Sequence, residues 1–243
     1  RVKEIANLAV QETGLGRVAH KIEKNILAAS RTPGPEILRP VAYTGDHGLT
    51  LHERAPFGVI GSITPSTNPT ETITNNAISM LSGGNTVVFN VHPGAKKISR
   101  QLVEWFNEAI VAAGGPENCV TCVAEPTIES AQALMKHKGI KVIVVTGGGA
   151  VVKAAMSSGK RAVCAGPGNP PVVVDETADL EQAGHDVVFG ASFDNNIICI
   201  VEKELFVVEK VADDLKKVML RNGAYELSAR QLREVEKHVI VDD

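Results

Sequence analysis

The sequence predicts an α/β fold in which a mostly parallel sheet is flanked by helices. Two observations predict it: short runs rich in valine alternate with longer segments of helical periodicity, and the runs are bounded by Gly, Pro or Asn. Strands that alternate with helices in this way form parallel sheets through right-handed crossovers. The expected strands are residues 85–91, 119–124, 141–146, 161–165 and 170–175.

Helical patterns lie between these runs. The clearest covers residues 95–116, where Ile98 and Leu102 begin an apolar face and two glycines and a proline end the segment. The last opens with Ser228 and, three residues later, Gln231, the spacing of a capping box. This last helix covers residues 228–239, and the other expected helices cover residues 1–16, 69–83, 127–137, 149–158, 179–192 and 210–222.

Composition and charge exclude several classes of partner. The 243 residues are 44% hydrophobic, enough for a sizeable core, and 28 acidic residues against 25 basic ones give a net charge of −3. No basic stripe points to nucleic acid or an anionic membrane, and no apolar run approaches the roughly 20 residues of a membrane-spanning helix. We therefore expect a cytoplasmic protein. A start on Arg and an end directly after a helical pattern lead us to expect a piece of a longer protein.

Three loops draw attention, because ligands of parallel sheets usually bind at loops that follow the strands. The first is "SITPSTNPTETITNN", in which Asn68 precedes Pro69, and Glu71 stands three residues after Asn68. An N-cap, a first-turn proline and a capping box would explain these three residues without any chemistry.

The second loop, "VTGGGAVVKAA", runs from a strand into a helix. Gly147 and Gly148 would let a ligand approach the backbone, and the helix start would favour an anion. It matches neither the GxGxxG nor the GxxxxGK[ST] pattern, so a tight turn explains it equally well. The third loop, "CAGPGNPPVVVD", is also consistent with a rigid connection.

The four cysteines differ in their surroundings. Cys119 and Cys122 have C-x-x-C spacing, but in a strand they would point to opposite faces, so we expect packing, no disulfide framework and no metal site. Cys164, in an expected strand, is interpreted in the same way. Cys199 ends "FDNNIIC", before the expected strand "IVEKELFVV", at a loop-to-strand junction. Local sequence leaves both packing and chemistry open for it.

Five segments, taken in order and spacing, resemble the aldehyde dehydrogenase superfamily: "PFGVIGSITPSTNPT", "VVFNVHPGAKK", "VIVVTGGGAVVKAA", "AGPGNPPVVVDETADLEQA" and "FDNNIICI". The likeness is strongest to its coenzyme A-acylating branch, which includes the propionaldehyde and acetaldehyde dehydrogenases of propanediol and ethanolamine utilisation. It extends over about residues 1–210. One such motif is unspecific, whereas five in register are specific.

The resemblance implies roles for individual residues. Cys199 matches the nucleophile and Asn68 the side-chain donor of the oxyanion hole. For His92, a nucleotide contact and a helix-entry turn stay open. The residues that match the nucleotide pocket are Thr64, Pro65, Ser66, Asn90, His92, Pro93, Gly94, Thr146, Gly147, Gly148, Val151, Ala165 and Gly166.

Two departures from the wider family refine the expected reaction. Hydrolytic members carry a water-activating Glu where this chain has Cys164, so the thioester should pass to coenzyme A, whose thiolate needs little help from a base. The usual pocket Lys is replaced by Phe89 and Asn90, which leaves NADP open beside NAD, the cofactor that the likeness favours.

The resemblance also implies three domains: residues 1–55 as an N-terminal helix and wrapping arm, residues 56–192 as a Rossmann-like nucleotide-binding domain, and residues 193–243 as the start of a catalytic domain, incomplete at its C-terminus. The implied function is NAD-dependent oxidation of a short-chain aldehyde to acyl-coenzyme A, in a homo-oligomer that a bacterial microcompartment could enclose. The alternatives are a related acylating semialdehyde dehydrogenase and a non-catalytic nucleotide-binding fragment.

Overall fold

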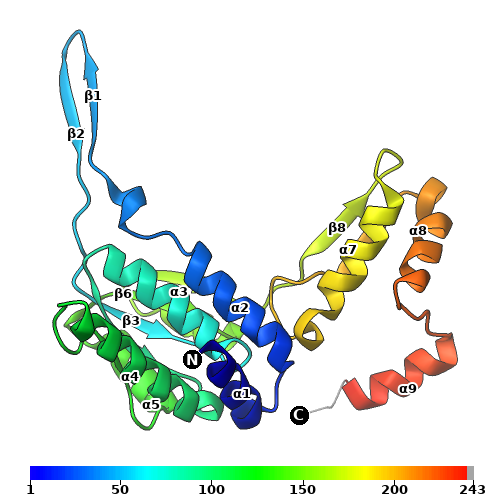
Figure 1. The fold of residues 1–243 in the computed structure, drawn as a ribbon, viewed down its shortest axis with the longest axis horizontal. Helices are drawn as coiled ribbons and strands as arrows, with labels where there is room; N and C mark the ends of the chain where they lie inside the picture. The colour runs from blue at the N-terminus through cyan, green and yellow to red at the C-terminus, as the bar shows by residue number, and fades with distance from the viewer. Residues whose placement is uncertain (240–243) are drawn as a thin grey trace. The chain divides into compact units, whose positions relative to one another are not determined.

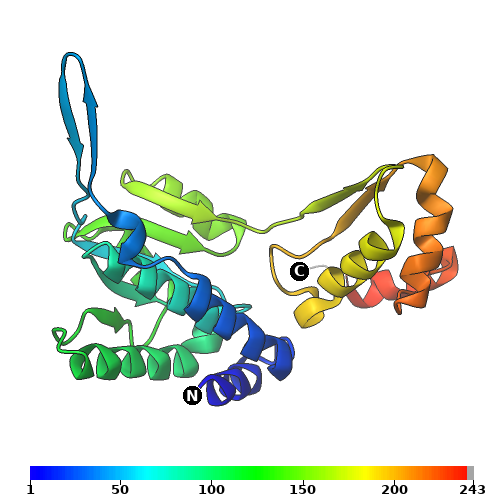
Figure 2. The same ribbon diagram turned by 45° about the horizontal axis from the view of Figure 1, so that its top comes forward.

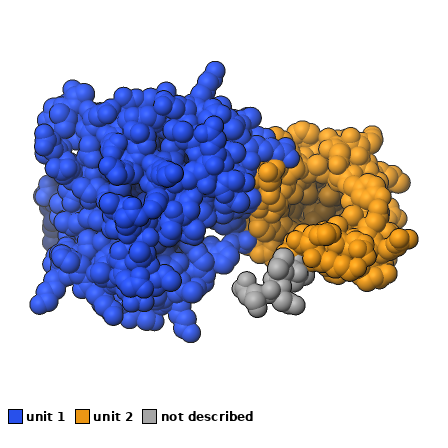
Figure 3. Space-filling view, turned by 90° about the horizontal axis from the view of Figure 1, so that it is seen from below, with its two compact units in different colours: residues 1–168, 197–199 blue, residues 169–196, 200–243 orange. Residues whose placement is uncertain are grey.

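The computed structural model of the chain describes residues 1–239, so the last four residues of the expected 193–243 domain lie outside it. The chain forms two compact units, coloured separately in Figure 3. Unit 1 contains Arg1–Gly168 and Ile197–Cys199; unit 2 contains Asn169–Asn196 and the chain from Ile200 onward. Unit 1 is interrupted after Gly168, because the next strand pairs outside the main sheet. The expected domain bounds at 55/56 and 192/193 stay predictions.

Unit 1 is built on a five-stranded, wholly parallel sheet of order β5-β4-β3-β6-β7. The expected parallel α/β architecture is confirmed. The central strand β3 was not among the expected strands, because Gly61 and Ser62 dilute its apolar run. Glycine suits this position, since a Cβ atom would make a tight contact, 3.1 Å, with the Leu134 side chain of a covering helix. The strands are β3 (Val59–Ile63), β4 (Thr86–Asn90), β5 (Val120–Cys122), β6 (Ile140–Thr146) and β7 (Arg161–Ala165).

Helices cover both faces of this sheet (Figures 1 and 2). On one face, Ile60 and Phe89 pack with residues of α1 (Val2–Thr13), α3 (Pro69–Ser82) and α4 (Lys96–Ala112). On the other, Ile143 and Val145 pack with α5 (Ile128–Lys136) and α6 (Gly149–Met156). Since the chain moves from β3 outward to β5 and then returns to β6, the order reverses between β3 and β6, where such sheets usually bind ligands.

The N-terminal segment forms more structure than a helix and an arm. After α1 comes a second helix, α2 (Val18–Arg31), which contacts α1 and α3. It was not expected because its polar and charged side chains hide the apolar periodicity. A 3-10 turn, η1 (Pro35–Leu38), then leads to an antiparallel hairpin of β1 (Val41–Gly45) and β2 (Gly48–His52), seen extending from unit 1 in Figure 1.

Unit 2 has a parallel pair, β8 (Pro171–Val174) and β9 (Glu204–Val207), with α7 (Leu180–Ser192), α8 (Glu209–Arg221) and α9 (Ala229–Val239). Between α7 and β9 lies a 3-10 turn, η3 (Phe193–Asn196). The expected capping box of α9 is confirmed: the Ser228 N–H donates to Gln231 Oε1 at 2.9 Å, and the Gln231 N–H donates to Ser228 Oγ at 3.3 Å. Within residues 1–239, no helix has the length and apolar character needed to cross a membrane.

Candidate functional site

The structure brings four expected pocket segments to one edge of the sheet. Thr64 follows β3, while Asn90, Thr146 and Ala165 are the last residues of β4, β6 and β7. The Thr64 N–H donates to the Asn90 carbonyl at 3.4 Å, and the Gly147 N–H donates to the Ala165 carbonyl at 3.1 Å. The carboxyl ends of these parallel strands therefore form a continuous edge, as a nucleotide site on such a sheet requires.

Groups at this edge fit a dinucleotide. The Thr64 hydroxyl is buried and has no hydrogen-bond partner among the described residues. Asn90 is also buried and its side-chain oxygen accepts from Ser130 Oγ at 2.5 Å, which fixes the amide. A Cβ atom at Gly148 or at Gly149 would meet nothing within 4 Å, so the backbone at the start of α6 is open to a ligand.

The remaining residues expected in the nucleotide pocket lie in or next to these loops. Pro65 and Ser66 are half-buried between β3 and α3, Val151 in α6 contacts Gly147, and Gly166 follows β7. His92 is exposed, and its Nδ1 accepts from the Gly94 N–H at 3.1 Å. This bond caps the 3-10 turn η2 (Pro93–Ala95). Of the two roles left open for His92, the helix-entry turn is therefore present, and the nucleotide contact stays a prediction.

Asn68 stands at the N-cap position of α3, but its side chain makes no capping bond. Its Oδ1 atom accepts from Lys24 Nζ at 2.6 Å, and its Nδ2 atom donates to Thr67 Oγ1 at 3.2 Å. Glu71 closes no capping box. It accepts from Asn25 Nδ2 at 3.3 Å and lies 3.5 Å from Lys24 Nζ. The capping interpretation of this loop is therefore wrong for both side chains, because they bond to Lys24 and Asn25 of α2 and not to the backbone of α3.

Cys199 lies in a turn that a distorted backbone precedes. Asp194, Asn195 and Asn196 have φ values of 50°, 58° and 61°, left-handed conformations that Asp and Asn tolerate better than most residues. The Asn196 amide holds the segment by donating to the Ala191 carbonyl at 2.6 Å. The expected strand is present as β9 but begins only at Glu204, so Cys199 lies in a turn and not at the strand junction.

The turn of Cys199 touches the loop after β7. A Cβ atom on Gly168 would collide with the carbonyl oxygen of Cys199, and only the glycine backbone leaves room for this approach. Both residues belong to unit 1. The half-buried thiol residue thus stands next to the loop that leaves the carboxyl edge of the sheet.

Of the other cysteines, Cys122 and Cys164 pack against the core of unit 1 as expected, whereas Cys119 lies outside the strand expected for it. All four are free thiols, and residues 1–239 contain no cluster of His, Cys, Asp or Glu that could hold a metal ion. Cys122 packs against the core of unit 1, and burial raises the pKa of its thiol above the ordinary value. Cys119 precedes β5, with its sulfur 3.4 Å from the Pro116 carbonyl.

Sequence reasoning missed the polar face of α2. Lys21, Lys24 and Asn25 are three and four positions apart, so they share one side of the helix. Lys21 is fully buried and donates from Nζ to the Thr67 carbonyl at 2.9 Å. The sequence signal that could have identified these residues is a pair of lysines and an asparagine at this spacing. It stands on a helix with few large apolar residues.

The family model for the "Aldehyde dehydrogenase family" matches residues 4–228. The chain belongs to the aldehyde dehydrogenase family. Acetaldehyde dehydrogenase (acetylating) EutE of Salmonella typhimurium is 56% identical over 235 residues, which are 96% of this chain and 50% of that protein. This aldehyde dehydrogenase chain thus spans about half the length of the curated relatives that it matches.

Two solved structures share the fold of this aldehyde dehydrogenase chain. A propionaldehyde dehydrogenase from the Clostridium phytofermentans fucose utilisation bacterial microcompartment is 49% identical, with a TM-score of 0.95 over 99% of this chain and 55% of its own. Rhodopseudomonas palustris propionaldehyde dehydrogenase, solved with bound CoA and an acylated cysteine, is 49% identical, with a TM-score of 0.93 and the same coverage. The resemblance to the acylating branch is confirmed.

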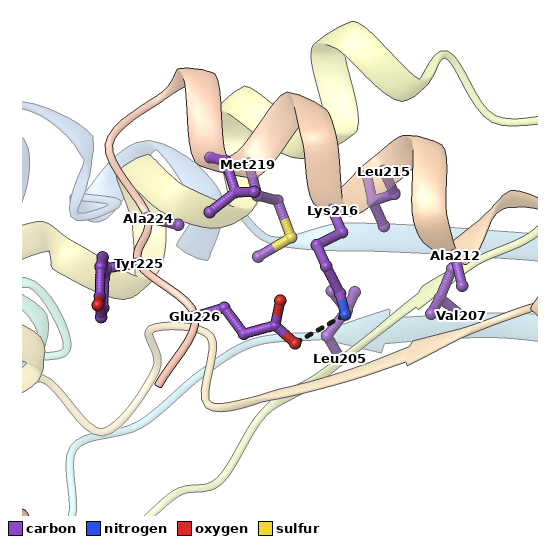
Figure 4. Close-up of a pocket in the computed structure, with 10 residues that line it drawn as sticks. Leu205, Val207, Ala212, Leu215, Lys216, Met219, Ala224, Tyr225 and Glu226 are labelled. Carbon is purple, nitrogen blue, oxygen red and sulfur yellow. Dashed lines mark hydrogen bonds and ion pairs between the residues drawn. The ribbon is translucent and has the colours of Figure 1, made fainter. Parts of the chain in front are cut away.

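A cavity of about 290 Å³ lies in unit 2 of this aldehyde dehydrogenase chain (Figure 4). Leu205 of β9 and Leu215 and Met219 of α8 line it, and the ion pair of Lys216 with Glu226, 2.8 Å apart, lies beside them. None of the candidate catalytic or nucleotide-binding residues lines this cavity.

Proposed function

We propose that the natural protein carrying this chain oxidises a short-chain aldehyde to an acyl-coenzyme A, with NAD or NADP as hydride acceptor and a thioester on Cys199 as intermediate. One observation carries the proposal: the Cys199 turn approaches Gly168 closely, which holds a cysteine beside the carboxyl edge of the sheet. The acetylating relative and the acylated cysteine of the solved neighbour support the reaction class.

In the first step, the thiolate of Cys199 adds to the carbonyl carbon of the aldehyde, and the carbonyl oxygen becomes an oxyanion. Asn68 Nδ2 and the Cys199 backbone N–H are the proposed donors to this oxygen. Fixed donors aimed at a developing charge are usually the largest single contribution to such catalysis. Because Asn68 makes no capping bond, its amide is available for this task.

A bound nicotinamide dinucleotide supplies the acceptor for the hydride that leaves the same carbon. The residues proposed to hold it are those of the carboxyl edge: the buried Thr64 hydroxyl, the fixed Asn90 amide and the open backbone of Gly148. We favour NAD from the family likeness. Loss of hydride leaves an acyl thioester on Cys199.

In the last step, the thiolate of coenzyme A attacks the thioester carbon, the bond from that carbon to the Cys199 sulfur breaks, and Cys199 leaves as a thiolate. Cys164 occupies the position at which hydrolytic members have a Glu. A cysteine at the end of β7 does not activate water as a carboxylate does, whereas a thiol nucleophile needs little general-base assistance.

The proposal extends to assembly and location. Val41, Tyr43, Leu49 and Leu51 of the β1–β2 hairpin are exposed, and exposed apolar side chains on a hairpin favour contact with a second copy. We propose a homo-oligomer that uses this hairpin. Enclosure in a microcompartment is proposed by analogy with the Clostridium phytofermentans protein.

The test uses the natural full-length protein with acetaldehyde or propionaldehyde and NAD or NADP, each with and without coenzyme A. We expect nicotinamide reduction only with coenzyme A, formation of acyl-coenzyme A, and loss of both in Cys199→Ala. Cys119→Ser is the matched control and should retain the activity. Equal turnover without coenzyme A would overturn the acyl transfer, and nucleotide binding without any turnover would favour the non-catalytic alternative.

A further inference from the structure

We propose that Lys24 is a positioning residue for the oxyanion donor: it fixes which end of the Asn68 amide faces the aldehyde. The inference rests on the proposed function, because it assigns a role to a residue outside the reacting groups. Lys24 lies on α2, 44 positions before Asn68 in the sequence, and donates from Nζ to Asn68 Oδ1 at 2.6 Å. Its role follows from the hydrogen-bonding capacity of the two side chains.

An asparagine side chain has an acceptor end and a donor end that differ little in shape. A lysine ammonium has three donors and no acceptor, so only the oxygen of Asn68 can face it. The Nδ2 end is consequently directed elsewhere, and one of its two hydrogens goes to Thr67 Oγ1 at 3.2 Å. The second N–H hydrogen of Nδ2 is the one that would form the hydrogen bond to the oxyanion. Without Lys24, the amide could rotate by half a turn and point its oxygen at the oxyanion. Two oxygen atoms with negative charge would then repel each other.

The ammonium group is itself held by a buried carboxylate. Lys24 Nζ lies 3.5 Å from Glu71 Oε1, and each side chain is 10% exposed. The two oxygens of Glu71 are further bound, by Asn25 Nδ2 at 3.3 Å and by Thr70 Oγ1 at 3.1 Å. At this degree of burial, a charge-assisted hydrogen bond is stronger than at the surface. A buried network whose polar groups are hydrogen-bonded to one another is also rigid.

A second lysine fixes the neighbouring backbone. Lys21, one turn before Lys24 on the same side of α2, is fully buried and donates from Nζ to the Thr67 carbonyl at 2.9 Å. Thr67 also accepts from Asn68 Nδ2 through its hydroxyl. The start of α3 is therefore clamped from α2 at two adjacent residues, one through the backbone and one through the catalytic amide.

The positive charge also strengthens the donor. A cation on the oxygen of an amide draws electron density from the nitrogen, so the N–H groups become better donors, as in other chains of polarised hydrogen bonds. The gain is largest when the acceptor is an oxyanion, which forms only during the reaction. Lys24 should therefore affect turnover more than the binding of the aldehyde, coenzyme A or nucleotide.

The test measures kcat and KM in the natural full-length protein. Lys24→Met combined with Glu71→Gln removes both buried charges together, so no carboxylate is left unpaired. We expect kcat to fall by about 10- to 10²-fold, less than the roughly 10²–10³-fold loss of a whole oxyanion donor because Asn68 itself is still present, with KM for aldehyde nearly unchanged. Lys24→Arg keeps a charged donor and should retain most of the turnover. Lys217→Met, which removes an exposed ion pair in unit 2, is the matched control.

A double-mutant cycle separates positioning from a structural role. If Lys24 acts through Asn68, the Lys24 and Glu71 substitutions should add almost nothing to Asn68→Ala, whereas a loss of general stability would lower kcat in both backgrounds. Lys24→Gln, which keeps a neutral donor, provides a milder variant if the double substitution does not fold; an intermediate kcat is expected.

Three outcomes would overturn the inference. Undiminished kcat in Lys24→Gln or in the double substitution would show that Asn68 needs no such partner, and additive losses in the Asn68→Ala background would show that Lys24 acts elsewhere. Wild-type protein without coenzyme A-dependent nicotinamide reduction would overturn the proposed function as well. Active wild-type protein with undiminished kcat in the Lys24→Met, Glu71→Gln double substitution would overturn this inference alone.

Discussion

The backbone of Gly168 lies against the carbonyl group of Cys199 so closely that residue 168 has no room for a side chain. This contact joins two segments about thirty residues apart in the sequence, the loop after β7 and the turn that carries the thiol. A carbonyl oxygen cannot rotate away as a side chain can, so the contact fixes the Cys199 backbone. The same residue carries the second proposed donor to the oxyanion, the Cys199 N–H.

Gly168→Ala should therefore impair the reaction. The added methyl group has to displace the Cys199 carbonyl, which would move the nucleophile, and misplacement by about 1 Å can cost about 10²-fold in rate. Steady-state kinetics of the full-length protein measure the loss. Gly45→Ala is the matched control, because a Cβ atom at Gly45 meets nothing within 4 Å. An unchanged kcat in Gly168→Ala would mean that the turn is free to shift.

Asn68→Ala should lower kcat by about 10²–10³-fold, the usual effect of losing one oxyanion donor. Asp179→Ala gives the comparison for a residue that truly caps a helix, since Asp179 Oδ1 accepts from the Glu181 and Gln182 N–H groups at 3.1 and 3.2 Å. That substitution should cost about 1 kcal/mol of stability with kcat unchanged. The opposite pattern in Asn68→Ala, lost stability and retained kcat, would restore the capping interpretation.

Glu12→Ala should destabilise unit 1 through α4. The two carboxylate oxygens of Glu12, at the end of α1, accept from the Lys97 and Ile98 N–H groups at 2.8 and 2.7 Å, so a residue from another helix caps α4. Loss of this anionic cap should cost about 1–2 kcal/mol. Chemical denaturation measures it, with Glu23→Ala on exposed α2 surface as control. Equal stability of both variants would contradict the capping role.

Cys122 should react slowly with iodoacetamide in the folded protein. Burial is the main cause that raises the pKa of its thiol, so near pH 8 the folded chain holds less thiolate there than the unfolded chain does. Between the ordinary thiol pKa and the raised pKa of the folded state, Cys122 is ionised in the unfolded chain but protonated in the folded chain. The free energy of unfolding therefore decreases as the pH rises through this interval. Mass spectrometry of alkylated peptides, with and without denaturant, measures the rates; equal rates would contradict the burial.

The sequence predicted β4, β6 and β7 nearly to the residue, because each is a valine-rich run that ends at a Gly, Pro or Asn signal. It did not predict β3 as a strand, although β3 is the centre of the sheet, because Gly61 interrupts the apolar pattern. The Leu134 side chain of α5 approaches Gly61 closely, and no local rule contains this contact. The β1–β2 hairpin was missed for a related reason: its exposed residues carry no buried face to show a period.

The sequence by itself determined which loops leave the carboxyl ends of the strands, and the order of its motifs marked Cys199 and Asn68. Periodicity and turn chemistry act between near neighbours, so they can be read along the chain. Only the tertiary structure decided what Asn68 bonds to and what holds the Cys199 turn. Lys24 meets Asn68, and Gly168 meets Cys199, across long stretches of chain, because sheet formation and helix packing bring these segments together. Those contacts decide whether an amide caps a helix or faces a substrate.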